Sequence, residues 1–342
     1  MDSRDSLWLE QLRDPDAPAA RRALAKIITL LESTRPDHRE RAGLLLDALL
    51  QRSGPTTRIG ISGVPGVGKS TLIEALGLHA IAQGHRVAVL AVDPSSTVHG
   101  GSILGDKTRM ERLSVHPRAY IRPSPSAGHL GGVASQTREA LLACEGAGYD
   151  VILVETVGVG QSEVAVAGMT DLFVLMQLPN AGDELQAIKK GVMELADLIW
   201  VNKADVDPVA TTRACAQMSG ALRLQAGLRG GDAAQVQPIS ALKGDTLAQA
   251  WQGVQDWLAQ RRADGRWLAR RQRQNRDWMW ERIHRGLRLA FEADPAVAQQ
   301  LPDISRRVLA GELASSTAAA RLLALHGVDA SRLSPTPSSP AG

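Results

Sequence analysis

The stretch from residue 63 to residue 71 combines residue types and spacing that suit the binding of phosphate groups. It follows the pattern G-x-x-x-x-G-K-S, in which glycines let backbone N–H groups approach phosphate oxygens closely. Lys69 is expected to bridge the β- and γ-phosphates, and Ser70 to ligate Mg²⁺. An apolar run precedes the motif and a helical pattern begins at Leu72, which is the strand–loop–helix setting that it requires. The sequence therefore predicts a triphosphate site made of Gly63, Val64, Pro65, Gly66, Val67, Gly68, Lys69, Ser70 and Thr71.

A second motif, N-K-A-D, follows the apolar run LIWV and indicates which base is bound. A carboxylate at Asp205 can accept hydrogen bonds from N1–H and the exocyclic amine of guanine, a donor pair that adenine lacks. A site built on such bonds rejects the wrong base by roughly 10⁴. Asn202 and Lys203 complete the predicted guanine site, together with a second loop after the last apolar run, made of Ser240, Ala241 and Leu242.

Acidic residues end two other apolar runs. Glu155 follows VILV, and Asp93 follows VAVLAV; Asp106 lies in the Gly-rich segment after Asp93. Carboxylates beside bound phosphates hold Mg²⁺ or orient the attacking water. Lys69, Asp93 and Glu155 are the predicted catalytic residues. The predicted metal ligands are Ser70, Asp93, Asp106 and Glu155. Glu155 stands where ordinary GTPases have aspartate.

The elements that would position these residues alternate between short apolar runs and helical stretches. The runs are apolar on both faces, as strands covered by helices on both sides should be. Strand and helix in series predict an α/β fold with a mostly parallel central sheet flanked by helices. The expected strands are 58–62, 86–92, 151–155, 171–177, 198–202 and 236–240.

Helical patterns precede and follow this region. Leu24, Ile27, Ile28 and Leu31 lie at helical spacing, and near the other end Trp280, Ile283 and Leu287 form another apolar face. We therefore expect four parts. They are an N-terminal helical extension (1–55), a nucleotide-binding domain (56–260), a C-terminal helical arm (261–330) and a disordered tail (331–342). The segments 94–109 and 122–132, rich in Gly, Ser and Pro, are expected to be functional loops.

Composition narrows the function classes. The chain has 342 residues, 44% of them apolar and 22% charged, which is typical of a globular protein. The two cysteines, Cys144 and Cys215, lie far apart, so neither a disulfide scaffold nor a zinc site is expected. No apolar stretch is long enough to cross a membrane and no signal sequence is evident, so we expect a cytoplasmic protein. The net charge of +3 gives no support to nucleic-acid binding, and the Arg-rich stretch 261–288 is interpreted as a solvated helix or dimer arm.

Taken in order, these segments resemble the MeaB/ArgK-type GTPases over about residues 20 to 260. The resemblance rests on GVPGVGKST, AVDPSS, GGSILGDKTRM, RPSPSAGHLGGV, CEGAGYD, ETVGVGQSE, AGDELQAIKKG and NKAD. It implies a P-loop NTPase fold and a GTP-hydrolysing chaperone that gates adenosylcobalamin loading and reactivation of an acyl-CoA mutase. The client would be methylmalonyl-CoA mutase or a relative acting on isobutyryl- or 2-hydroxyisobutyryl-CoA.

The resemblance also implies partners and moving parts. It predicts a homodimer formed through the C-terminal arm, an adenosylcobalamin-dependent mutase as client and a cobalamin adenosyltransferase as a further partner. The protein itself would need GTP and Mg²⁺ but not cobalamin. Segments 106–109 and 155–163 would be the first two switches. A third, 181–190, would couple to the mutase through Asp183, Glu184, Gln186 and Lys189.

Two departures and two alternatives accompany this interpretation. Asn180 and Ala187 stand where the family usually has glycine; asparagine tolerates a left-handed backbone, whereas Ala187 matters only if φ is positive there. A metal-insertion GTPase would call for a Cys pair or a His-rich tract, and the sequence has neither. An ATP-dependent kinase linked to amino-acid transport is the second alternative, against which N-K-A-D argues.

Overall fold

The structure, a computed structural model, describes residues 2–33, 35–93, 110–125, 130–156, 162–179, 191–229 and 232–328. The chain forms two compact units, residues 1–271 and residues 272–342. No helix among the described residues is long and apolar enough to cross a membrane.

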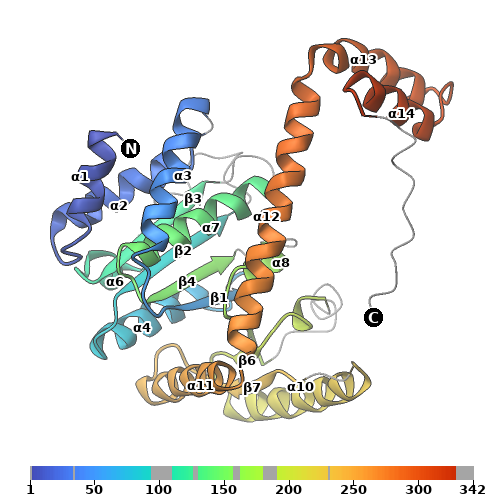
Figure 1. The fold of residues 1–342 in the computed structure, drawn as a ribbon. Helices are drawn as coiled ribbons and strands as arrows, with labels where there is room; N and C mark the ends of the chain where they lie inside the picture. The colour runs from blue at the N-terminus through green and yellow to red at the C-terminus, as the bar shows by residue number, and fades with distance from the viewer. Residues whose placement is uncertain are drawn as a thin grey trace. The chain divides into compact units, whose positions relative to one another are not determined.

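The first unit is built on a seven-stranded sheet in which every neighbouring pair is parallel (Figure 1). The strands are β1 (Thr57–Gly63), β2 (Val87–Asp93), β3 (Ala119–Pro125), β4 (Val151–Thr156), β5 (Leu172–Gln177), β6 (Leu198–Val201) and β7 (Gln235–Pro238). Their order across the sheet is β3-β2-β4-β1-β5-β6-β7. The expected α/β fold is confirmed, and the sheet is wholly rather than mostly parallel.

One face of the sheet is covered by α4 (Lys69–Ala82), α6 (Glu111–Val115) and α11 (Gly244–Ala263). Alternate strand residues such as Ile59, Val89 and Leu153 point into this layer and are fully buried. The apolar face of α11 predicted from sequence packs here through Trp251, Val254, Trp257 and Leu258.

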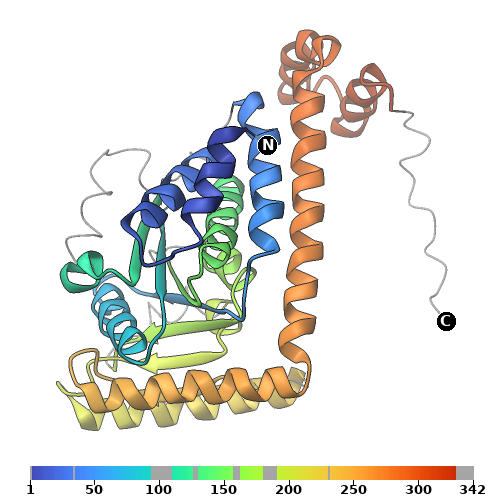
Figure 2. The same ribbon diagram turned by 60° about the vertical axis from the view of Figure 1, so that its left-hand side comes forward.

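The opposite face is covered by the three N-terminal helices together with helices from the middle and later parts of the first unit's sequence (Figures 1 and 2). Leu24, Ile27, Ile28 and Leu31 pack there with Ile152 and Val154 of β4, so the N-terminal helices share the core of the sheet. The helices of this layer are α1 (Ser3–Gln11), α2 (Pro18–Leu31), α3 (Pro36–Leu50), α7 (Leu130–Gly146), α8 (Ser162–Ala167) and, against β5 and β6, α10 (Pro208–Arg229).

The expectation of a loop over 122–132 is wrong at both ends. Residues up to Pro125 belong to β3, and α7 begins at Leu130. The prolines that made this segment resemble a loop are tolerated because β3 is an edge strand. The Arg118 carbonyl accepts from Val87 N–H, so alternation turns the backbone polar groups of 119, 121, 123 and 125 away from β2. Pro123 and Pro125 thus replace N–H groups that would have no partner in the sheet.

Three aspartates secure the amino ends of the strands. Asp150, Asp171 and Asp197 directly precede β4, β5 and β6. Each aspartate forms two bonds with one residue at the start of a neighbouring strand: its backbone N–H donates to that residue's carbonyl, and its carboxylate accepts from that residue's N–H. The neighbouring residues are Arg86, Arg58 and Phe173, and the bonds to the carboxylates measure 2.7, 2.9 and 2.8 Å. These bonds satisfy backbone groups where the ladders begin.

Arginine–carboxylate pairs join this edge to the start of α12 (Arg266–Ala293). Arg271 donates two bonds of 2.7 Å to Asp171, whose side chain is fully buried, and Arg58 forms a similar pair with Glu145. Arg270 contacts Asp197. The second unit contains the rest of α12 with α13 (Pro295–Leu309) and α14 (Ser315–Leu325), which pack through Val297, Ile304 and Leu322. The predicted tail lies outside the described residues.

Candidate nucleotide site

The predicted phosphate loop lies between β1 and α4, at the carboxyl end of the sheet. Gly66 and Gly68 adopt φ of 78° and 98°, a left-handed conformation that other residues rarely take. A Cβ on Gly68 would also lie 2.7 Å from Nδ2 of Asn202. Helix α4 begins immediately after Gly68, so its free N–H groups and positive dipole end are directed at the loop, as binding of an anion requires.

Lys69 holds its ammonium group beneath this loop. Its Nζ donates to the carbonyl oxygens of Gly63 at 2.9 Å and of Val64 at 3.3 Å, and the residue is only 9% exposed. Both carbonyls belong to the loop itself and are neutral, so phosphate oxygens can replace them as acceptors. A buried ammonium group at a helix N-terminus attracts an oxyanion strongly.

Glu155 faces Ser70 across the end of the sheet. Strand β4 pairs with β1 so that Glu155 lies opposite Ile61, and the Ser70 hydroxyl donates to its carboxylate at 3.3 Å. A hydroxyl and a carboxylate that converge in a buried site are oxygen donors of the type that Mg²⁺ takes. Asp93 ends β2, the strand on the other side of β4; its side chain and the whole of Asp106 lie outside the described residues.

The predicted guanine loops meet the phosphate loop through Asn202. Its Nδ2 donates to the Val67 carbonyl at 2.7 Å, and its Oδ1 accepts from Ala241 N–H at 3.2 Å. One buried side chain therefore ties together three loops that are far apart in the sequence. Lys203, next to it, has φ of 64°, the one left-handed residue other than glycine in the described chain.

Asp205 is prepared to act as an anionic acceptor. A hydrogen bond from Ser240 holds its pKa below the ordinary value of 3.8, so the carboxylate is ionised at neutral pH. Ser240 is itself fixed by Thr246, whose hydroxyl accepts from Ser240 N–H and contacts its carbonyl, whereas Leu242 is 79% exposed. Thr246 was not predicted from the sequence, because only the fold brings the first turn of α11 back to this loop.

The residues predicted to couple to a partner, Asp183, Glu184, Gln186 and Lys189, lie outside the described residues. The same holds for 106–109 and for most of the second predicted switch. Of that switch, Glu163 is described; it is buried in α8 and accepts a hydrogen bond from Ser162 at 3.1 Å.

A glycine-rich loop between β1 and α4, an acid on the strand beside β1 and an N-K-x-D loop after β6 together define a P-loop GTPase. The profile of one family within this class, described as "Methylmalonyl Co-A mutase-associated GTPase MeaB", matches residues 24–296. The chain belongs to the MeaB family.

Individual relatives agree with this assignment. The Mycobacterium tuberculosis protein named "Probable GTPase Rv1496" is 54% identical over 304 residues, covering 89% of this chain and 90% of the relative. The mouse "Methylmalonic aciduria type A homolog, mitochondrial" is 44% identical over 334 residues, covering 94% and 80%. The crystal structure of a protein named "LAO/AO transport system kinase" superposes with a TM-score of 0.74 at 33% identity, covering 96% of this chain and 99% of that one.

Proposed function

We propose that this GTPase is a chaperone of an adenosylcobalamin-dependent acyl-CoA mutase, and that its GTP cycle gates cofactor loading and reactivation of that client. The observation that carries the proposal is the extent of the family match. It runs from residue 24 to residue 296 and includes helices outside the nucleotide-binding elements. A shared nucleotide site alone would not require most of α2 and the whole of α3 and α12 to match. Methylmalonyl-CoA mutase is the first client to test, with a cobalamin adenosyltransferase as a further cytoplasmic partner.

In the proposed reaction, water attacks the γ-phosphorus of GTP and the bond to the β,γ-bridging oxygen breaks, giving GDP and phosphate. Lys69 leaves its two carbonyl partners to pair with the β- and γ-phosphate oxygens. The N–H groups of the loop and of α4 bind the same oxygens. Glu155 or Asp93 orients the attacking water. Without the client, this orientation is incomplete and intrinsic turnover is slow.

The oxygen donors of the site fit Mg²⁺. Ser70 and Glu155 already converge at 3.3 Å, and Asp93 and Asp106 would complete the ligand set. When bound, the ion would neutralise charge on the phosphate oxygens. Guanine would be held by Asp205 as acceptor, with Asn202 and Lys203 and the loop 240–242 forming the rest of its pocket.

The link to the client is assigned to the switches. The mutase would order segments 106–109 and 155–163, and segment 181–190 would contact it through Asp183, Glu184, Gln186 and Lys189. Partner activation of this type raises turnover by ~10³–10⁵ in other GTPases. Substituting alanine for Asp183, Gln186 and Lys189 should lower the ratio of mutase-stimulated to intrinsic turnover. If all three variants keep the full ratio, the assignment of this segment is wrong.

We also propose that the protein is a homodimer formed through its C-terminal arm. Trp280, Ile283 and Leu287 on α12 are 50%, 40% and 62% exposed and lie at helical spacing. A run of exposed apolar side chains of this size is typical of a protein interface. Light scattering after size-exclusion chromatography should give a dimer for the natural chain and a monomer for Ile283→Asp with Leu287→Asp.

The deciding experiment is turnover of GTP and of ATP, each with and without methylmalonyl-CoA mutase and, in parallel, its isobutyryl- and 2-hydroxyisobutyryl-CoA relatives. Slow, GTP-selective turnover that rises with one mutase supports the proposal and identifies the client. GTP turnover that no mutase changes contradicts the chaperone role. A preference for ATP would favour the kinase alternative, because the similar crystal structure is that of a protein named as a transport system kinase.

A further inference from the structure

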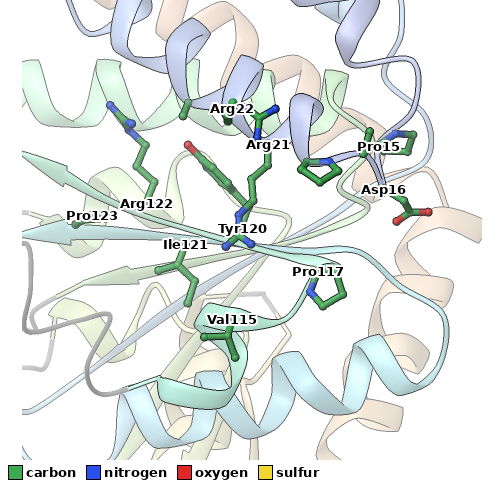
Figure 3. A pocket seen from close by; sticks show the side chains of 13 residues that line it. Pro15, Asp16, Arg21, Arg22, Val115, Pro117, Tyr120, Ile121, Arg122 and Pro123 are labelled. Atoms are coloured by element: carbon green, nitrogen blue, oxygen red, sulfur yellow. The ribbon is translucent and has the colours of Figure 1, made fainter.

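A cavity of about 770 Å³ lies at the edge of the first unit, away from the nucleotide loops. It is bounded by the start of α2, by the segment that follows α6 and by β3, as Figure 3 shows. Four consecutive residues of β3, 120–123, line it, so the cavity spans the edge of the strand. Its volume is in the range of sites that bind small organic molecules.

The charges around this cavity do not balance. Arg122 pairs with Glu32, and Asp16 pairs with Arg86. Arg21 donates to the neutral carbonyl of Ser114 at 3.0 Å, and the exposed Arg22 forms no ion pair with any residue that the structure describes. Two guanidinium groups at the start of one helix thus have no carboxylate partner within the described part of the chain.

The rest of the lining is mainly apolar. Ala25, Val115 and Ile121 contribute to its walls along with several prolines. Tyr120 is 5% exposed and its hydroxyl interacts with Arg122, so it adds a polar contact without adding charge. An apolar wall beside arginines that have no carboxylate partner among the described residues matches a ligand with both an apolar body and an oxyanion, because a guanidinium group can bind two oxygens of a carboxylate or phosphate.

The edge strand itself argues against a peptide as the occupant. An added strand would need N–H groups along the outer edge of β3, and positions 123 and 125 are prolines. The ladder that fixes a bound strand cannot form there. A compact ligand that uses side chains for recognition is compatible with the same edge.

We propose that this cavity binds a small organic anion, with Arg21 and Arg22 pairing with its carboxylate or phosphate group and its apolar body lying against Ala25, Val115 and Ile121. Because no residue of the nucleotide site lines the cavity, anion binding can be tested separately from the function proposed above.

The test uses the full-length protein with excess GDP and Mg²⁺, titrated with octanoate and with octyl phosphate by calorimetry. Octan-1-ol is the uncharged probe. We expect each anion to bind saturably at one site per chain and the alcohol at least about tenfold more weakly. The tighter of the two anions identifies the group that the arginines prefer.

Two variants and a matched control locate the site. Arg22→Gln should weaken anion binding about tenfold, since it removes a charge-assisted pair. Ala25→Trp should abolish binding by filling the cavity. Arg39→Gln, which removes an exposed arginine from α3, should change nothing. Thermal unfolding shows whether each variant is folded. If Ala25→Trp does not fold, the affinity of Arg22→Gln for the anion tests the proposal by itself. Binding that Arg22→Gln leaves unchanged, or that the alcohol matches, would overturn the proposal.

Discussion

The two ends of the parallel sheet use charged residues in opposite ways. At the amino ends, Asp171 accepts from Arg58 N–H and from Nε and one terminal nitrogen of Arg271, so both of its carboxylate oxygens have strong partners. At the carboxyl ends, Lys69 donates to two loop carbonyls, and Glu155 accepts a 3.3 Å bond from a hydroxyl. Bonds to neutral partners are weaker than bonds between charged ones, so a ligand can replace them.

This difference separates charges that hold the fold from charges that serve chemistry. Burial alone does not distinguish them, because Asp171, Lys69 and Glu155 are all buried. The strength of the described bonds does distinguish them. The arginine bonds of Asp171 compensate its desolvation within the protein, whereas the two described carbonyl bonds of Lys69 can be exchanged for stronger bonds to phosphate. Substitutions at the amino ends should therefore lower the free energy of unfolding, whereas substitutions at the carboxyl ends should lower GTP turnover.

The largest effect is expected for Asp171→Ala. Its loss leaves Arg271 without its main partner and Arg58 N–H without an acceptor, which should lower the free energy of unfolding by about 3–5 kcal/mol. Asp150→Ala is the matched control, because Asp150 forms the same bond to the adjacent strand but its side chain is 41% exposed. Asp150→Ala should lower the free energy of unfolding by about 1 kcal/mol. Urea unfolding measures both; equal losses would show that burial of the pair is unimportant.

Lys69→Ala should give the reverse result. Without the ammonium group on the phosphates, GTP turnover should fall by ~10²–10³. The unfolding free energy of the nucleotide-free protein should change by less than about 1 kcal/mol, because the lost carbonyl bonds are offset by the desolvation cost that leaves with the ammonium group. Steady-state phosphate release and urea unfolding are the two measurements. A loss of several kcal/mol with turnover intact would remove the contrast between the two ends.

The two ends of the sheet also differ in how much of each could be predicted from the sequence. The site at the carboxyl end of the sheet could be predicted because its residues lie in short stretches of sequence: Gly63 to Thr71 are contiguous, and Glu155 ends its own apolar run. The bond from Asn202 to Val67 could not be predicted, because the two residues lie far apart in the sequence and only the fold brings them together. The aspartates at 150, 171 and 197 were visible before each apolar run, but the residues that they bind are set by strand order. Strand β3 was interpreted as a loop because Pro123 and Pro125 are permitted only by its place at the edge.

Asp205→Asn tests the proposed guanine acceptor, and its expected effect is smaller than that of Lys69→Ala. An amide places an N–H against the N1–H of guanine, so GDP affinity should fall ~10²-fold. The bond from Ser240 lowers the Asp205 pKa below 3.8, so the acceptor is lost only as the pH falls through that lowered value. In the natural protein, titration of Asp205 should therefore leave GDP affinity level between about pH 5 and pH 8. Fluorescence titration with a labelled GDP measures both effects, and a fall in affinity centred near pH 6 would assign the dependence to another group.

The smallest expected effect is at Lys203, and it separates backbone strain from side-chain function. A φ of 64° costs a lysine about 1 kcal/mol or more relative to glycine, part of which the greater flexibility of glycine in the unfolded chain cancels. Lys203→Gly should therefore leave stability unchanged or raise it by up to about 1 kcal/mol, although GDP affinity falls. Lys26→Gly, at an exposed position inside α2, has no strain to relieve and should be destabilised by about 1 kcal/mol. If the two variants lose equal stability, the left-handed backbone at Lys203 is not strained, and the carboxyl end of the sheet stores no conformational energy beside its base-binding loop.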